Sequence, residues 1–283
     1  MYGVGDIISQ PFKAYRENQE SKHMISGSLN FYILEMTLVR SKGLTLRLFL
    51  VVFFEVLFEF LIINLLRGIG EYNNLVFLFW DKCLFFSLLI VLNATLTQQK
   101  IHFSIKLNKE QRKLIFTLTI ILIVIGLVNK GNFLSAFIIG LIASTTEEYL
   151  FRGIILVTLF KLFRNSKSQL SRILFPLVIS SVLFGLEHFL NLYSQSLFLT
   201  VVQVCQTMAM GFLFACIFVR TRNLLFPIVC HFCIDFIITA FWGMQNNNNV
   251  SFKSSIFIII LYLIVGFAIL MPTLTDNNPL VKK

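Results

Sequence analysis

Long apolar runs alternate with short polar segments along most of the chain. A helix that crosses about 30 Å of hydrocarbon needs roughly 20 apolar residues, and runs of suitable length occur about eight times. The third run is short and the fourth is long, so the boundary between them is open. The pattern predicts an all-α, polytopic integral membrane protein with about eight transmembrane helices, near residues 48–66, 75–96, 114–128, 133–161, 173–193, 197–219, 224–242 and 254–271.

The two ends of the chain differ from this middle part. Residues 1–47 mix polar and apolar positions, which favours a cytoplasmic or interfacial segment. Residues 48–271 form the predicted transmembrane domain, and residues 272–283 a polar cytoplasmic tail.

Composition excludes a soluble domain. The chain is 57% hydrophobic and 13% charged, with a mean hydropathy of +0.80, whereas soluble domains carry about 25% charged residues. The net charge of +10 could indicate nucleic-acid binding, but the basic residues fall in short segments between the apolar runs. This distribution is typical of membrane topology, so we expect a lipid bilayer and no nucleic acid as partner.

The basic residues also predict the orientation. Nineteen of the 24 Lys and Arg residues fall on one side of the predicted spans and three on the other. Positively charged loops stay in the cytoplasm, and an even number of spans returns the chain to its starting side. We therefore expect a multi-pass cell-membrane protein with both termini cytoplasmic. Abundant Phe, Ile, Asn and Lys indicate an AT-rich genome and favour a bacterial host.

Several predicted spans contain ionisable residues. Such groups are costly in hydrocarbon and usually mark function. They are Glu147, Glu148 and Arg152 in the fourth span, Glu187 and His188 in the fifth, His231 and Asp235 in the seventh, Glu55 and Glu59 in the first, and Asp81 and Lys82 in the second.

Helix rise places three of these clusters at one depth. Glu147, His188 and Asp235 lie 14, 16 and 13 residues from the basic end of their helices, which is roughly 21, 24 and 20 Å at 1.5 Å per residue. Counting from Phe133 instead would bring Glu147 nearer the cytoplasm. The common depth favours one site over separate structural residues, although a structural pair or a packing histidine remains an alternative.

Helical spacing separates the roles within the fourth span. Glu148 and Arg152 are four residues apart and so share a face, which predicts a buried ion pair. Glu147 points about 100° away from Glu148 and has no such partner in its helix. A carboxylate of this kind in a low-dielectric site suits a base that works near neutrality. His231 and Asp235 also share one face.

Read in order, the clusters form the motifs E-E-x-x-x-R (Glu147, Glu148, Arg152), F-x-x-x-H (Phe184, His188) and H-x-x-x-D (His231, Asp235). This ordered set resembles the CPBP family of intramembrane proteases, which includes the type II CAAX prenyl proteases and relatives from bacteriocin loci. The resemblance covers about residues 114–245. It implies an all-α membrane fold with a central intramembrane cavity, in which a peptide bond is hydrolysed.

The resemblance also implies residue roles. Glu147 would activate water and His188 would help to hold it. Glu148 and Arg152 would support that carboxylate, and Phe184 would pack or gate. His231 and the residue at 235 would stabilise the oxyanion.

One position departs from many relatives, which have Asn where this chain has Asp235. Asn donates a hydrogen bond to an oxyanion, whereas Asp donates only if it is protonated. Asp235 could otherwise fix the tautomer of His231, or ligate a divalent metal such as zinc together with Glu147, His188 and His231. Both metal-assisted and glutamate-only schemes exist for the family, and we favour the scheme without a tightly bound metal.

The sequence thus predicts an intramembrane endopeptidase that cuts a membrane-associated protein or peptide with a glutamate-activated water. A signalling peptide, a bacteriocin precursor or an anchored regulator suits a bacterial host better than a prenylated CAAX protein. One alternative is a non-proteolytic bacteriocin self-immunity or membrane regulatory protein. Another is an ion transporter, which the absence of repeated halves disfavours.

Overall fold

The structure is a computed structural model that describes residues 42–66, 68, 74–243 and 251–275. The chain divides into two compact units, 1–46 and 47–283. The candidate active site lies in the second unit. Most of the predicted N-terminal segment, 1–47, and most of the predicted tail, 272–283, fall outside the described residues.

The described residues are mostly helical and contain no strand, and eight helices are long and apolar enough to cross a membrane. This confirms the predicted fold class of a polytopic membrane protein. The spans are Lys42–Leu66, Leu75–Thr97, Lys109–Val128, Lys130–Phe163, Leu170–Tyr193, Leu197–Thr221, Leu225–Trp242 and Phe252–Leu274.

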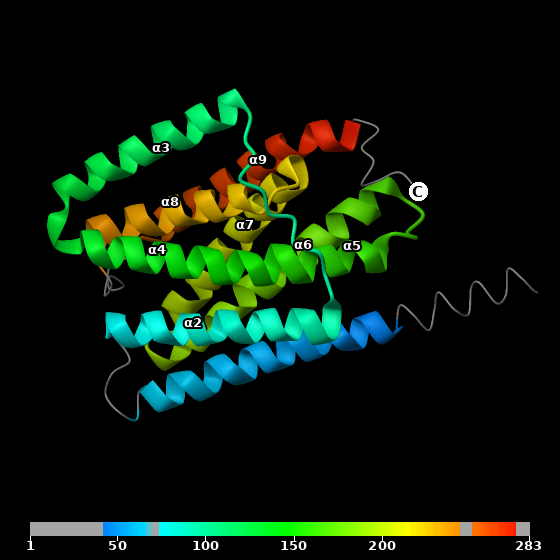
Figure 1. Ribbon diagram of the computed structural model, residues 1–283, viewed down its shortest axis with the longest axis horizontal. Helices are drawn as coiled ribbons and strands as arrows, with labels where there is room; N and C mark the ends of the chain where they lie inside the picture. The colour runs from blue at the N-terminus through cyan, green and yellow to red at the C-terminus, as the bar shows by residue number, and fades with distance from the viewer. Residues whose placement is uncertain (1–41, 67, 69–73, 244–250, 276–283) are drawn as a thin grey trace, which may run out of the picture. The chain divides into compact units, whose positions relative to one another are not determined.

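Figure 1 labels the α-helices, and several spans also contain segments of another helix type. Three elements follow one another without a break in the fourth span: α4, then the π-helix η3, then α5. In chain order the elements are α2 (Leu75–Leu92), η1 (Asn93–Thr97), α3 (Lys109–Val128), η2 (Lys130–Asn132), α4 (Phe133–Glu148), η3 (Tyr149–Leu156), α5 (Val157–Phe163), α6 (Gln169–Glu187), η4 (His188–Tyr193), α7 (Leu197–Thr221), α8 (Leu225–Trp242) and α9 (Phe252–Thr275).

Polar caps explain why some helices begin before their apolar runs. The α3 helix starts at Lys109, five residues ahead of the predicted 114, because Asn108 and Gln111 form a capping box. Such reciprocal hydrogen bonds satisfy backbone groups that a helix leaves free at its first turn. Hydropathy alone does not detect this polar first turn.

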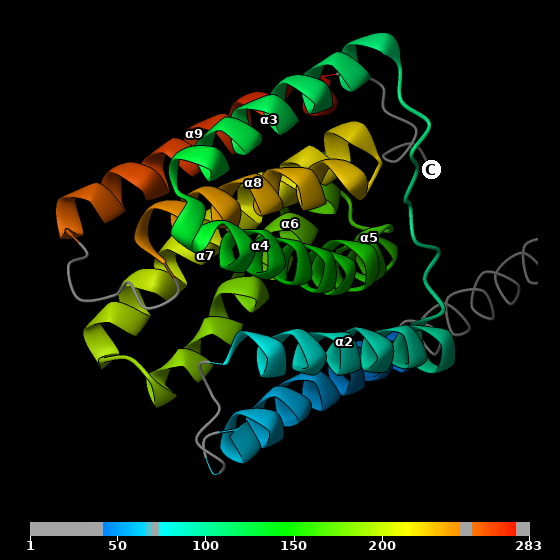
Figure 2. The same ribbon diagram turned by 60° about the vertical axis from the view of Figure 1, so that its left-hand side comes forward.

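The α4 helix lies between α2 and α8, which both pack against it (Figures 1 and 2). Helix α8 packs most extensively against α4. In addition, α6 packs against α7, and α7 packs against α9. Helix α4 therefore has one face toward α2 and another toward α8. The site is built around these two faces.

Many large apolar side chains point outward, among them Phe49, Ile121 and Ile264, which are 63%, 47% and 62% exposed. In water such a surface would be unfavourable, but hydrocarbon solvates it. The exposed aromatic and aliphatic residues thus agree with the multi-pass membrane assignment.

Candidate active site

Glu147 and Glu148 end α4, and their side chains lie in different surroundings. The Glu148 side chain is fully buried, and its Oε1 lies 3.1 Å from Nη1 of Arg152, whose side chain is also fully buried. The structure thus contains the ion pair that the four-residue spacing predicts. Glu147 keeps 14% of its side chain exposed.

Arg152 is enclosed by aromatic rings and one backbone carbonyl. Its guanidinium carbon lies 4.5 Å from the ring centre of Phe184 and 5.3 Å from that of Phe214. Its Nη2 donates to the carbonyl oxygen of Gly211 at 2.9 Å. A desolvated cation gains from aromatic faces as well as from its counter-ion, so this surrounding holds the Arg152 charge in place.

Gly211 makes that approach possible. A Cβ at this position would lie 2.8 Å from Cδ1 of Phe184 and 3.3 Å from Nη2 of Arg152. The first distance is too short for two carbon atoms. Only glycine leaves room there for both side chains.

The helix changes type beside this pair. Residues Tyr149–Leu156 form the π-helix η3, and Ser180 Oγ of α6 donates to the Phe151 carbonyl oxygen within it at 3.0 Å. Wide turns of this kind inside α-helices are frequent at functional sites. The apolar periodicity of the sequence gives no signal for this change, which depends on partners from other helices.

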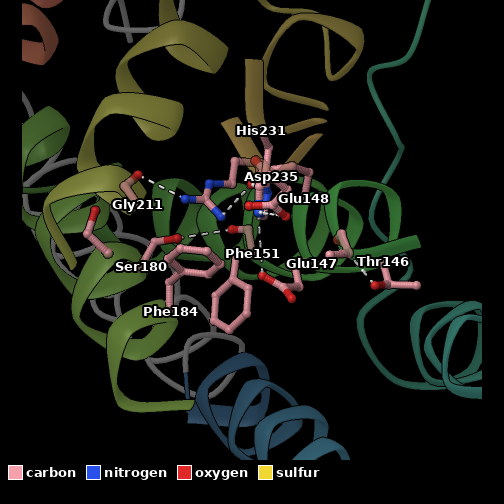
Figure 3. A network of polar contacts seen from close by, with 12 residues as sticks. Thr146, Glu147, Glu148, Phe151, Ser180, Phe184, Gly211, His231 and Asp235 are labelled. Atoms are coloured by element: carbon pink, nitrogen blue, oxygen red, sulfur yellow. Dashed lines mark hydrogen bonds and ion pairs between the residues drawn. The ribbon is translucent and has the colours of Figure 1, made fainter. Parts of the chain in front are cut away.

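His231 of α8 joins the two glutamates, as Figure 3 shows. Its Nδ1 donates to Glu148 Oε1 at 3.0 Å, and its Nε2 lies 3.2 Å from Asp235 Oδ2 and 3.9 Å from Glu147 Oε2. The ring stacks on Phe214 with centroids 4.8 Å apart. The imidazole is therefore fixed on three sides, with its Nε2 edge directed at Glu147 and Asp235.

His188 stands at the junction between α6 and the 3-10 helix η4. Its Nδ1 donates to the carbonyl oxygen of Phe184 at 3.0 Å, since a carbonyl can only accept. In a neutral ring this leaves Nε2 as an acceptor. The fully buried Phe184 ring lies edge-on to both His188 and His231, at 5.4 and 6.0 Å, and so separates the two imidazoles.

A cavity of about 240 Å³ opens beside Glu147 and His188. Many of its other lining residues come from the first helix and α2, which contain none of the three sequence motifs. The lining residues are Glu59, Ile62, Ile63, Leu66, Leu78, Asp81, Lys82, Glu147, Glu187, His188, Leu190, Asn191 and Gln203.

The polar residues of this cavity are partly paired with one another. Lys82 Nζ lies 2.5 Å from Glu59 Oε1, and Asn191 Nδ2 donates to Gln203 Oε1 at 3.0 Å. The sequence did give a signal for Glu59 and Lys82, because charges in two neighbouring apolar spans are best accommodated as a pair. Their position beside Glu147 could not be read from it.

The structure brings Glu147, Glu148, Arg152, His231 and Asp235 into one contact network, and places His188 in the same cavity as Glu147. Within the part of the chain that the structure describes, no three His, Cys, Asp or Glu side chains are placed to hold a metal ion. The described side chains, as arranged, do not fit a metal centre.

The chain matches a family model over residues 129–237, that of the type II CAAX prenyl endopeptidase Rce1-like domain. All three motifs fall inside this segment. The match confirms the predicted resemblance to the CPBP family of membrane-embedded proteases over this segment. No curated protein and no solved structure shows a significant match to the chain.

Proposed function

We propose that this protein is an intramembrane endopeptidase in which Glu147 activates the hydrolytic water. One contrast carries the proposal. Glu148 is sealed between Arg152 and His231, whereas its neighbour Glu147 lines an open cavity together with His188. Only a carboxylate that reaches a cavity can meet both water and substrate.

The reaction follows from the donors and acceptors around that cavity. A water held by Glu147 and by the free Nε2 of His188 attacks the scissile carbonyl carbon and passes its proton to Glu147. The carbonyl oxygen becomes an oxyanion. Glu147 then gives the proton to the departing amine, so the products are a carboxyl group and an amine. No serine or cysteine is needed, and no acyl-enzyme forms.

His231 supplies the charge that opposes the oxyanion. Its Nδ1 faces the Glu148 carboxylate and its Nε2 faces the Asp235 carboxylate, and a ring that donates to both is an imidazolium. Because Nε2 also points toward Glu147, it lies close to where the oxyanion forms. Preorganised donors at this place are usually the largest contribution to such catalysis. Asp235 is then an acceptor that orients His231 and not itself an oxyanion donor.

The substrate is a membrane-associated peptide or protein, because the cavity lies within the apolar spans. We further propose that both termini lie in the cytoplasm and that the host is a bacterium. The basic-residue distribution supports the first statement and the residue usage supports the second.

The proposal is tested in the native host by comparing Glu147→Gln with wild type. The change keeps the shape of the side chain and removes the base. Glu110→Gln is the matched control, since Glu110 is an exposed glutamate in the first turn of α3. Membrane peptides and new N-termini are measured by mass spectrometry.

We expect Glu147→Gln to abolish specific cleavage products at unchanged protein abundance, and Glu110→Gln to leave them intact. If the Glu147→Gln cells keep every product and also keep resistance to a cognate bacteriocin, the protease function is wrong and a binding role in immunity replaces it.

A further inference from the structure

The cavity beside Glu147 is built by two sets of helices. Glu147, His188 and Gln203 come from the segment that matches the family model, residues 129–237. Glu59, Asp81 and Lys82 come from the first helix and α2, which lie outside it. Residues that share a small cavity with a catalytic base contact the groups next to the scissile bond, so these two helices can set substrate preference.

The charges around this cavity do not balance. Among the described residues that line it, Lys82 is the single Lys or Arg, against the four acids Glu59, Asp81, Glu147 and Glu187. Lys82 is already paired with Glu59. Among the described residues, Asp81 and Glu187 therefore have no ion-pair partner of their own.

The strongest individual signal is Asp81. Its side chain lines the cavity, only 8% of the residue is exposed, and its Oδ1 has no hydrogen-bond partner within the described ranges. A buried carboxylate oxygen without a donor is unfavourable by several kcal/mol in an apolar surrounding. Such a group is tolerated in a functional site when a ligand supplies the donor.

Glu187, at the end of α6, repeats this pattern on another wall of the cavity. Its Oε2, like Oε1 of Glu55 in the first helix, is buried without a hydrogen-bond partner among the described residues. A cation that enters the cavity would therefore find acceptors on α2 and on α6.

The size and the walls of the cavity indicate what kind of cation fits. Its volume of about 240 Å³ lies below the roughly 300–1,000 Å³ that is usual for whole small-molecule ligands, so it suits one side chain. Ile62, Leu78 and Leu190 provide apolar wall for a methylene stem. Lysine and arginine combine such a stem with a charged head.

A divalent metal ion does not suit the same groups. No three carboxylate, imidazole or thiol side chains in the described ranges converge closely enough to ligate one. The acceptors are distributed around the cavity, which suits an ammonium or guanidinium group with several N–H donors.

We propose that this cavity binds a lysine or arginine side chain of the substrate close to the scissile bond, with Asp81 and Glu187 as its acceptors. The inference rests on the proposed endopeptidase function. It assigns the chain a preference for basic residues, determined by one acceptor on α2, outside the family-matched segment, and by one on α6, inside it.

The test uses the full-length protein reconstituted in phosphatidylcholine vesicles. Lipid-anchored, internally quenched peptides carry lysine, arginine, norleucine or citrulline at one position at a time. Norleucine and citrulline reproduce the stems of lysine and arginine without the charge. The readout is the ratio of kcat/KM for each charged peptide to that for its neutral counterpart.

We expect a ratio of at least about 10 at one position near the cut in wild type, because a desolvated charge pair discriminates strongly. Asp81→Asn should lower this ratio toward 1. Glu187→Gln, which keeps the size of the side chain and removes its charge, provides a second and independent variant. Glu110→Gln, far from the cavity lining, should keep the wild-type ratio.

The outcomes separate the two proposals. Cleavage by wild type that Glu147→Gln abolishes, with no preference for charged peptides or with the wild-type ratio retained in both cavity variants, overturns the basic-residue site alone. If no peptide is cut in a manner that depends on Glu147, the endopeptidase function fails and the basic-residue site fails with it.

Discussion

Two adjacent glutamates face two different environments in this molecule. On the α8 side, Glu148 lies in a closed network in which Arg152 and His231 satisfy one of its oxygens. On the α2 side, Glu147 borders a cavity whose walls hold more acids than cations. In the first region the charges are paired with one another, whereas in the second Asp81 and Glu187 have no ion-pair partner among the described residues. A rotation of about 100° between successive helix residues is enough to separate these roles.

The closed region should be the more sensitive to loss of one charge. Arg152→Ala leaves the buried Glu148 with His231 alone opposite it, and removing one partner of a buried ion pair costs about 3–5 kcal/mol. We expect the folded yield, measured by size-exclusion chromatography in detergent, to fall severely. Arg164→Ala, at an exposed arginine in the loop after α5, serves as the control. A normal yield of Arg152→Ala would show that the pair does not hold the network together.

A smaller effect is expected from crowding the same region. Gly211→Ala places a methyl group against Phe184 and Arg152, and overpacking of this kind costs about 1–3 kcal/mol. The thermal unfolding midpoint in detergent should therefore drop. Gly131→Ala is a matched control, because a Cβ at Gly131 meets no atom within 4 Å. Equal midpoints for the two variants would contradict the tight enclosure of Arg152.

Asp235→Asn tests the carboxylate that faces His231 Nε2. The amide oxygen of Asn can still accept from His231 Nε2, but the charge assistance to this hydrogen bond is lost, at a cost of about 1 kcal/mol. Turnover should fall by about tenfold or less, with an unchanged unfolding midpoint. A complete loss of turnover would show that the negative charge itself is indispensable there.

The smallest effect is expected from metal removal. Because the described side chains offer no group of three ligands placed around one point, we expect dialysis against a chelator to leave peptide hydrolysis unchanged. The measurement is turnover before and after dialysis, with zinc added back. Loss with zinc-dependent recovery would assign Glu147, His188, His231 and Asp235 to a metal site.

Some of this arrangement was predictable from the sequence. Eight apolar runs give eight spans, because hydrocarbon thickness sets helix length independently of packing. The Glu148–Arg152 pair followed from helical spacing. Motif order also predicted that the fourth and seventh spans meet, and α4 does pack on α8.

Other features depend on contacts between helices distant in sequence. The π-helix η3 is held by Ser180 and by the burial of Arg152 against Gly211, none of which leaves a local signal. The place of the Glu59–Lys82 pair beside Glu147 depends on how the first helix and α2 pack around α4. Hydropathy and motif spacing carry no information on that packing.

The central claim is that Glu147 activates the hydrolytic water, whereas Glu148 stabilises the structure around it. Glu147→Gln and Glu148→Gln, purified side by side, test it most directly through turnover and unfolding midpoint together. We predict that Glu147→Gln keeps the wild-type midpoint and loses roughly 10²–10⁴-fold in turnover, while Glu148→Gln lowers both. Retained turnover in Glu147→Gln, or a wild-type midpoint in Glu148→Gln, would contradict the account.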